Sequence, residues 1–381
     1  MRFESPLLDF IRVSQFGGEV SSSDVDWDAL YSAAKVQAVL GIVSPVVPEE
    51  VKKTDARWRE YSYRQMAKYA RYIHAESALK ELLDGAGVRF VILKGNAAAI
   101  YYKDPARRQM GDIDFLTSDF EAARKAMLEA GYKLVHESDQ YARHIGFDKD
   151  GVLFELHRWF SHEEADIERF LTSGMEKIEI GVTEGHEFPM LPKLANGMVL
   201  LDHMRAHLKS GLGLRQIVDW MMYVHRELDD AFWKAEFEEA VREAGLRKLA
   251  VTATNMCQRY LGLPDGISWC EEADEELVDD LMGIVLVSGN FGHVHAQGSK
   301  VDTVTTRFRQ KGVFRSLQMA GEYNWKAYKR HHYLKPFAWA YQIGRYTKQG
   351  LKAGRSAREL RGDLARSRDR SSVLDRLKDG K

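Results

Sequence analysis

Cysteine is scarce in this chain, with two among 381 residues, Cys257 and Cys270. Two cysteines cannot build a disulfide scaffold, and their scarcity favours a reducing compartment such as the cytoplasm. Long apolar runs are also missing: the best, 281–287, falls far short of the roughly 20 residues that cross a bilayer. Charged residues interrupt the opening 18 residues, which therefore lack the core of a signal peptide. We expect a cytoplasmic protein without a membrane span.

Net charge is nearly absent, because 55 Lys+Arg face 56 Asp+Glu. This balance hides an asymmetry. Residues 301–381 hold 20 Lys+Arg and 7 Asp+Glu, or +13, whereas residues 1–300 hold 35 and 49, or −14. The sequence thus joins an acidic body to a basic C-terminal segment.

Internal repeats and low-complexity tracts are absent, and the hydrophobic periodicity changes along the chain. Helical spacing is found at 27–47, 58–83, 119–130, 194–208, 214–226, 231–244 and 248–261, and short β-forming runs at 88–93, 111–117, 132–136, 143–147 and 152–156. The pattern predicts an α+β fold with a small mixed-sheet core. We place an N-terminal helical region at 1–85, the α/β core at 86–192, a helical domain at 193–300 and the basic helical segment at 301–381.

Three acidic residues fall on two of the predicted strands. Successive side chains of a strand alternate between faces, so Asp112 and Asp114 project from one face. By the same alternation Glu155 projects from the face opposite to Phe154 and Leu156. If the two strands are neighbours, three carboxylates converge and repel one another, unless a divalent cation such as Mg²⁺ neutralises them. Two such ions can align an attacking hydroxyl and stabilise a leaving phosphate. We therefore predict Asp112, Asp114 and Glu155 as catalytic, metal-binding residues.

A glycine turn precedes these acids. Gly95 ends an apolar strand and opens a short helix, which lets backbone N–H groups approach a phosphate. Lys94 and Arg108 supply further cations for a triphosphate. His157 shares the strand face of Glu155 and could touch a phosphate, although a half-buried polar residue is an equally good interpretation. Either motif alone is a weak signal, and their combination carries the prediction.

This combination resembles the polymerase-β-type nucleotidyltransferase superfamily. More narrowly, the Leu-Lys-Gly, Arg-x-Met-x-Asp-Ile-Asp-Phe-Leu and Glu-Leu-His-Arg-Trp segments, with Arg215 and Asp219, are similar to a bacterial group of uncharacterised nucleotidyltransferases. The resemblance implies that Asp112 and Asp114 hold two Mg²⁺ ions and that Glu155 completes the site beside the acceptor. It implies a nucleotide-binding set made of Lys94, Gly95, Asn96, Arg108, His157, Arg215 and Asp219. Asn96 stands where the superfamily usually has Ser or Gly; the Ser contacts a phosphate, and an Asn can donate a hydrogen bond there.

The function implied is transfer of a nucleoside monophosphate from an NTP to an acceptor hydroxyl or phosphate on a small molecule, saccharide, peptide or RNA. Three alternatives stay open. The first is a glycosyltransferase with an Asp-x-Asp pair, which usually needs a larger, doubly wound sheet. The second is a toxin-like enzyme that modifies tRNA or protein. The third is a non-catalytic nucleotide-binding module.

Weaker candidates lie in the helical regions. His203 and His207 have the i, i+4 spacing of a metal pair, but no further ligand pattern supports a zinc site. Arg215 and Asp219 share this spacing, and a structural ion pair is the leading interpretation. For the pair His293 and His295 we favour a loop without function.

The basic end has two interpretations. A narrow apolar stripe from Trp339 to Leu364 indicates an amphipathic helix, which could lie against the acidic body, an anionic membrane surface or RNA. The alternative is a helix that packs at 339–346 and then frays into a solvated tail. We favour the solvated tail, because the stripe has few large apolar residues.

Overall fold

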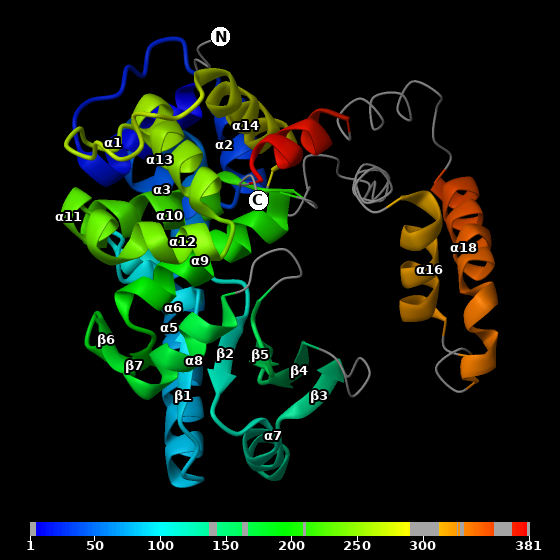
Figure 1. Ribbon diagram of the computed structural model, residues 1–381. Coiled ribbons are helices and arrows are strands. Elements are labelled where there is room, and N and C mark those ends of the chain that lie inside the picture. Colours follow the sequence, from blue (N-terminus) through cyan, green and yellow to red (C-terminus); the bar gives the residue numbers. More distant parts are fainter. Residues whose placement is uncertain are drawn as a thin grey trace.

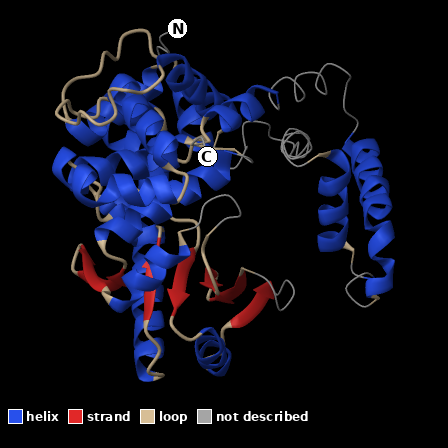
Figure 2. Ribbon diagram, in the orientation of Figure 1, coloured by secondary structure: helices blue, strands red, loops and turns tan. Residues whose placement is uncertain are grey.

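The computed structural model describes residues 5–136, 143–161, 167–208, 211–289, 312–325, 327, 331–353 and 368–378. Its architecture is α+β, as the sequence predicts: a body of helices lies over one sheet (Figures 1 and 2). The helices are α1 (Pro6–Phe16), α2 (Trp27–Val36), α3 (Leu40–Val43), α4 (Glu49–Thr54), α5 (Ala56–Gly85), α6 (Gly95–Ala99), α7 (Phe120–Glu129), α8 (Glu168–Glu176), α9 (Lys193–Leu208), α10 (Leu214–Glu227), α11 (Asp230–Phe232), α12 (Glu238–Glu243), α13 (Arg247–Leu261), α14 (Glu275–Ser288), α16 (Val313–Asn324) and α18 (Ala338–Ala353).

The sheet is mixed and has seven strands in the order β3-β4-β5-β2-β1-β7-β6. The pairs β2/β5 and β1/β7 are parallel, and the other four pairs are antiparallel. This is not a doubly wound parallel sheet, so it disfavours the glycosyltransferase alternative. The strands are β1 (Phe90–Leu93), β2 (Ile113–Thr117), β3 (Lys133–His136), β4 (His144–Lys149), β5 (Val152–His157), β6 (Glu179–Thr183) and β7 (His186–Met190).

A hydrophobic core fills the space between the sheet, α5 and α7. The 30-residue helix α5 begins at Asp55, whose side chain accepts a hydrogen bond from the Arg57 N–H, and runs along the sheet (Figure 1). Its buried side chains pack against those of β1, β2 and β5. From α5 these are Tyr69, Tyr72, Leu79 and Leu83, and from the strands they include Phe90, Phe115 and Phe154. The long helix thus supports the sheet from the side opposite to the site described below.

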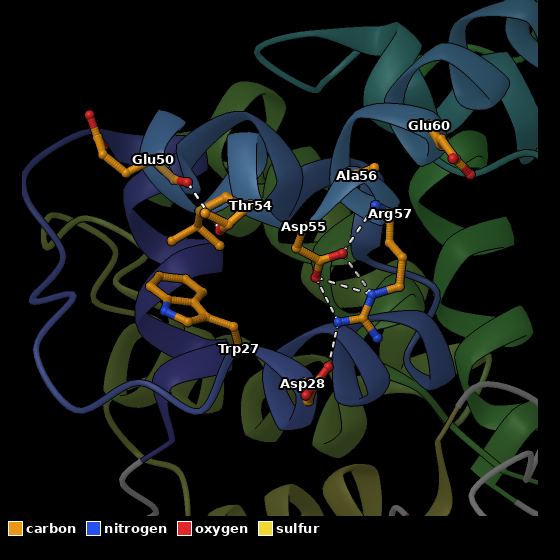
Figure 3. Close-up of a pocket in the computed structure, with 9 residues that line it drawn as sticks. Trp27, Asp28, Glu50, Thr54, Asp55, Ala56, Arg57 and Glu60 are labelled. Atoms are coloured by element: carbon orange, nitrogen blue, oxygen red, sulfur yellow. Dashed lines mark hydrogen bonds and ion pairs between the residues drawn. The ribbon is translucent and has the colours of Figure 1, made fainter.

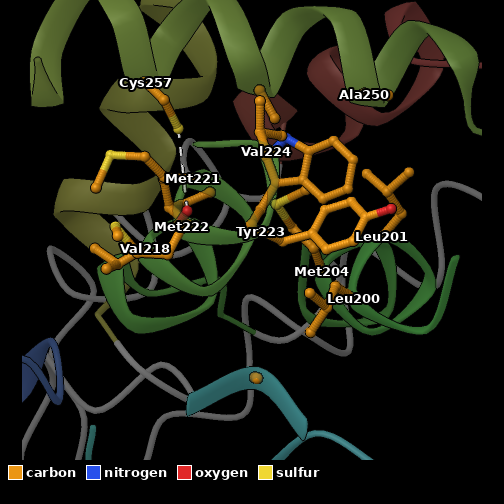
Figure 4. Close-up of a cluster of buried hydrophobic side chains, with 14 of the residues drawn as sticks. Leu200, Leu201, Met204, Val218, Met221, Met222, Tyr223, Val224, Ala250 and Cys257 are labelled. Atoms are coloured by element: carbon orange, nitrogen blue, oxygen red, sulfur yellow. Dashed lines mark hydrogen bonds between the residues drawn. The ribbon is translucent and has the colours of Figure 1, made fainter. Parts of the chain in front are cut away.

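A second core joins helices from both ends of the chain. Figure 4 shows its centre, where Met221 to Val224 of α10 lie between α9 and α13. Gly197 of α9 allows a close approach here, because a Cβ at this position would lie 2.4 Å from the Tyr223 hydroxyl oxygen. That hydroxyl donates a hydrogen bond to the Lys193 carbonyl at 2.9 Å. Since α1 and α14 share this core, it brings together residues from the proposed N-terminal region and helical domain, whose boundaries stay predictions.

The helix predicted at 27–47 is broken in the structure. Helix α2 ends at Val36, and Ala38 takes a positive φ of 56°. The break is tied to the distant helices, because the Gln37 side chain donates to the Val285 carbonyl at 3.0 Å and accepts from the Leu214 N–H at 2.8 Å. Hydrophobic spacing alone could not reveal this interruption.

The end of the chain is not a solvated tail. Residues 368–376 form a helix that lies beside α14 (Figure 1), and Val373, Leu374 and Leu377 are buried in the second core. Arg376 pairs with Asp280 at 2.7 Å and with Asp274 at 3.1 Å. The prediction of a frayed end is therefore wrong for this part, which lies against the acidic body. Among the described residues no helix has both the length and the apolarity to cross a membrane. His293 and His295 lie outside the described residues.

Candidate active site

Three carboxylates meet where β2 and β5 run side by side. The two strands are parallel neighbours, and Asp114 lies directly opposite Glu155 in the register. Asp112 precedes β2 by one residue. One carboxylate oxygen from each of the three residues lies within 4.8 Å of the others. The convergence predicted from strand alternation is thus present.

The three groups differ in charge because their surroundings differ. Burial and the negative charge of Asp114 raise the pKa of Glu155 to about 8. The charge of Asp114, followed by burial, also raises the pKa of Asp112. For Asp114 burial acts in the same direction, but Lys94 and His157 outweigh it and hold its pKa well below the usual range. Closely placed carboxylate oxygens that resist ionising together fit a divalent cation with oxygen ligands, such as Mg²⁺.

Lys94 occupies a strained turn between β1 and α6. Its φ of 54° and ψ of −128° suit glycine, and a residue with a side chain loses about 1–3 kcal/mol in such a conformation. The Lys94 ammonium lies 2.6 Å from the Asp114 carboxylate, and its side chain is largely buried. The strain is consistent with a lysine side chain that the site requires, because it balances the buried charge of Asp114.

Two histidines flank Glu155. His157 is fully buried, and its Nε2 lies 2.9 Å from Asp114 Oδ1 and 3.7 Å from Glu155 Oε2. His144, which the sequence analysis did not single out, places its Nε2 3.5 Å from Glu155 Oε1. Burial lowers the pKa of both rings, that of His144 to about 4, and so disfavours the charged imidazole in each.

The Asp150-Gly151 dipeptide in the sequence is a signal for the position of His144. Asp150 and Gly151 both have positive φ, 53° and 73°, as a two-residue type I′ hairpin turn requires. Counting back from this Asp-Gly turn along β4 and β5 pairs His144 with His157, which is the observed register. The dipeptide in the sequence therefore fixes His144 beside the predicted site.

A cavity of about 200 Å³ opens onto these groups. Residues from the sheet, from the loop before β2 and from the helical body share its wall: Lys94, Gly95, Arg108, Gly111, Asp112, Asp114, Arg143, His144, Glu155, His203, His207 and Arg215. His203 and His207 of α9 are thus part of the same cavity, with their Nε2 atoms 2.9 Å apart. Arg143, His203 and His207 were missing from the predicted site, because only the packing of α9 and β4 brings them to it.

The family model described as "Uncharacterised nucleotidyltransferase" matches residues 23–262. The chain belongs to this family. Among proteins with curated functions none matches it. The matched range contains the sheet, the carboxylates and the helices α9 and α10 that close the cavity.

The loop before β2 is fixed by a buried ion pair. Arg108 donates two hydrogen bonds to the Asp219 carboxylate, from Nε and Nη2, each at 2.7 Å. The Tyr102 hydroxyl donates to the same carboxylate at 2.7 Å. Asp219, predicted to pair with Arg215, thus has Arg108 as its bidentate partner. Arg215 donates to the Gln109 carbonyl at 3.1 Å, and burial lowers its pKa.

Asn96 lies beside the cavity rather than in its wall. Its side chain is fully buried, and Nδ2 donates a hydrogen bond to Glu76 Oε2 on α5 at 2.7 Å. In this arrangement the amide anchors the turn to α5. Gly95, one residue earlier, does line the cavity.

A larger hollow of about 660 Å³ lies elsewhere, between α2, α4 and the start of α5 (Figure 3). Trp27 forms part of its wall. Arg57 spans it, donating to Asp55 at 2.6 Å and also to Asp28. Four acidic residues and one arginine line it, and Asp28 and Asp55 pair with that arginine, so the residues described around this hollow include no trio of converging acids like that of the smaller cavity.

Proposed function

We propose that this nucleotidyltransferase moves a nucleoside monophosphate from an NTP to an acceptor hydroxyl or phosphate and releases pyrophosphate. The observation that carries the proposal is the meeting of Asp112, Asp114 and Glu155 beside Lys94 in one cavity. Membership of the family supports nucleotidyl transfer as the reaction class. The proposed compartment is the cytoplasm, where NTPs are available.

Mg²⁺ is the proposed cofactor, with two ions held by Asp112, Asp114 and Glu155. Bound there, Mg²⁺ would offset the charge that develops on the transferred phosphate and on pyrophosphate. The carboxylates themselves fix the orientation of the reacting groups. Glu155 stands at the end of the trio next to His144 and would accept a hydrogen bond from the acceptor, which orients its oxygen for in-line attack.

The remaining lining residues would bind the triphosphate. Lys94 and Arg215 face the carboxylates and carry positive charge, and the Gly95 turn offers its backbone N–H groups. Arg108 and Asp219 would act indirectly, because their mutual ion pair holds α10 against the loop that carries Asp112. Catalysis then rests on positioning and on charge stabilisation within a partly buried site.

The alternatives differ in how well they fit these residues. A toxin-like enzyme that modifies tRNA or protein would use the same site on a larger acceptor, so the acceptor class stays open. A non-catalytic binding module is less favoured, because an intact acid trio with strained Lys94 has no evident structural use.

The experiment is a labelling screen. Purified full-length protein is incubated with cell lysate, Mg²⁺ and each NTP labelled at its α-phosphate, and labelled species are identified. We expect label on one acceptor class, and transfer lowered roughly 100-fold or more by Glu155→Gln. The surface variant Glu60→Gln serves as the matched control and should transfer normally. Transfer by Glu155→Gln at the wild-type rate would contradict the assigned role of Glu155.

A further inference from the structure

The surroundings of Glu155 contain potential metal ligands other than the three carboxylates. His144, Glu155 and His157 form a second group whose three ligand atoms lie within 4.8 Å of one another. The two imidazoles come from directly opposed positions of β4 and β5, and Glu155 lies two residues before His157 on the same strand face. Gly146 stands opposite Glu155, so no side chain from β4 fills the space between them.

The spacing of these atoms suits coordination better than hydrogen bonding. The separations from Glu155 are 3.5 Å for His144 and 3.7 Å for His157, longer than a good N–H···O bond of about 2.7–3.2 Å. Metal–ligand bonds of about 2.0–2.2 Å at tetrahedral angles place neighbouring ligand atoms roughly 3.3–3.6 Å apart. The two separations run to Oε1 and Oε2 of one carboxylate, so a small divalent ion that takes both imidazoles draws the three ligand atoms, now within 4.8 Å, closer together.

The donor types separate this group from the acid trio. Carboxylate oxygens alone suit Mg²⁺, whereas two imidazoles with one carboxylate suit Zn²⁺ and its first-row neighbours such as Co²⁺ and Mn²⁺. His144 lines the cavity, so an ion held there keeps an open position toward it. His157 Nε2 lies 2.9 Å from Asp114 Oδ1, so this nitrogen coordinates an ion only when the ring carries its proton on Nδ1.

We propose that His144, Glu155 and His157 form a site for one divalent transition-metal ion, with Glu155 shared between this site and the Mg²⁺ site. The two imidazoles hold the ion beside Glu155, which the proposed function places next to the acceptor oxygen. This second role rests on the proposed nucleotidyl transfer, whereas the metal binding itself does not.

The test uses Co²⁺ as the probe, because its visible absorption changes when imidazoles coordinate it. Metal-free full-length protein is titrated with Co²⁺ in excess Mg²⁺, which occupies the all-oxygen site. We expect about one Co²⁺ per chain with a histidine-type spectrum, and an affinity roughly tenfold or more lower in His144→Ala. The His144 side chain is partly exposed, and circular dichroism verifies the fold; His144→Gln gives a second variant of similar size.

Two variants sharpen the assignment. Asp112→Asn should keep the Co²⁺ spectrum while losing MgATP binding, which separates this site from the one on which the proposed function depends. His207→Ala should also keep the spectrum. Co²⁺ binding that is lost with His207 but retained without His144 would move the ion to the α9 histidine pair and overturn the proposal. Absence of any Co²⁺ spectrum in the wild type would overturn it as well.

Discussion

The two hollows described above differ in size and in the state of their charges. The larger one, around Arg57, has carboxylates at Asp28 and Asp55 that pair with a neighbouring guanidinium. The smaller one contains three converging carboxylates, Asp114 buried and Asp112 and Glu155 half-buried, whose pKa values diverge, with Glu155 raised to about 8 and Asp114 lowered. Groups removed from water must resolve their repulsion by protonation, ion pairing or metal binding. In this protein the convergence of carboxylates around the buried Asp114, and not volume, marks the cavity that is equipped for chemistry.

The largest difference between the hollows is expected in MgATP affinity, when one acidic residue of each hollow is substituted. Asp112→Asn should lower MgATP affinity by roughly 100-fold or more, because a metal ligand is lost, whereas Asp28→Asn should leave it unchanged. Calorimetric titration of both variants measures this. In the absence of metal, Asp112→Asn should unfold at a slightly higher temperature than wild type, because one repelling charge is gone. Equal MgATP affinities in the two variants would remove the distinction between the hollows.

The second contrast concerns the ion pair behind the smaller cavity. Asp219→Ala leaves the Arg108 guanidinium buried without its bidentate partner, and we expect a loss of about 3–5 kcal/mol of unfolding free energy. Urea unfolding followed by circular dichroism gives the value. A variant as stable as wild type but unable to bind nucleotide would show that Asp219 contacts the nucleotide directly.

The third contrast is pH dependence. Glu155 holds its proton more tightly in the folded chain, with a pKa of about 8 against an ordinary value of 4.5, so its stabilising contribution is complete below pH 4.5 and is lost as the pH rises through 8. Metal-free wild type should lose about 1–2 kcal/mol between pH 6.5 and 8.5 relative to Glu155→Gln. His144 acts oppositely, losing its contribution as the pH falls from 6.5 through 4, outside this window. Urea unfolding midpoints of wild type and Glu155→Gln, measured at pH 6.5 and 8.5, test this prediction. An equal change of midpoint in the two proteins would refute the raised pKa of Glu155.

The smallest effect is expected in the larger hollow. Arg57→Ala removes a surface ion-pair network, and exposed pairs of this kind contribute little. We expect the urea midpoint and MgATP affinity to stay within error of wild type. A clear loss of ATP binding would instead identify this hollow as a nucleotide site.

Strand alternation predicted which acidic side chains share a face, because its period is two, but their convergence also needed β2 and β5 to be neighbours, which the structure supplies. It could not give the direction of Asn96, since its partner Glu76 lies twenty residues earlier on another helix. Nor could the i, i+4 spacing of His203 and His207 reveal their place in the cavity wall, which depends on how α9 packs against the sheet. Strands β6 and β7 also went unpredicted, with Pro189 obscuring the second of them.

The shared helical core has a consequence for biosynthesis. Helix α1 contacts α13, whose first residue follows the end of α1 by roughly 230 positions. At about 5–20 residues per second, the part of this core that α13 supplies follows α1 by roughly 10–50 s, whereas α2 and α3, which also contact α1, are made much sooner. The last residues of this core, Val373, Leu374 and Leu377, come later still. During that interval the N-terminal helices have only one another to cover the apolar side chains of α1, among them Leu7, Phe10 and Ile11.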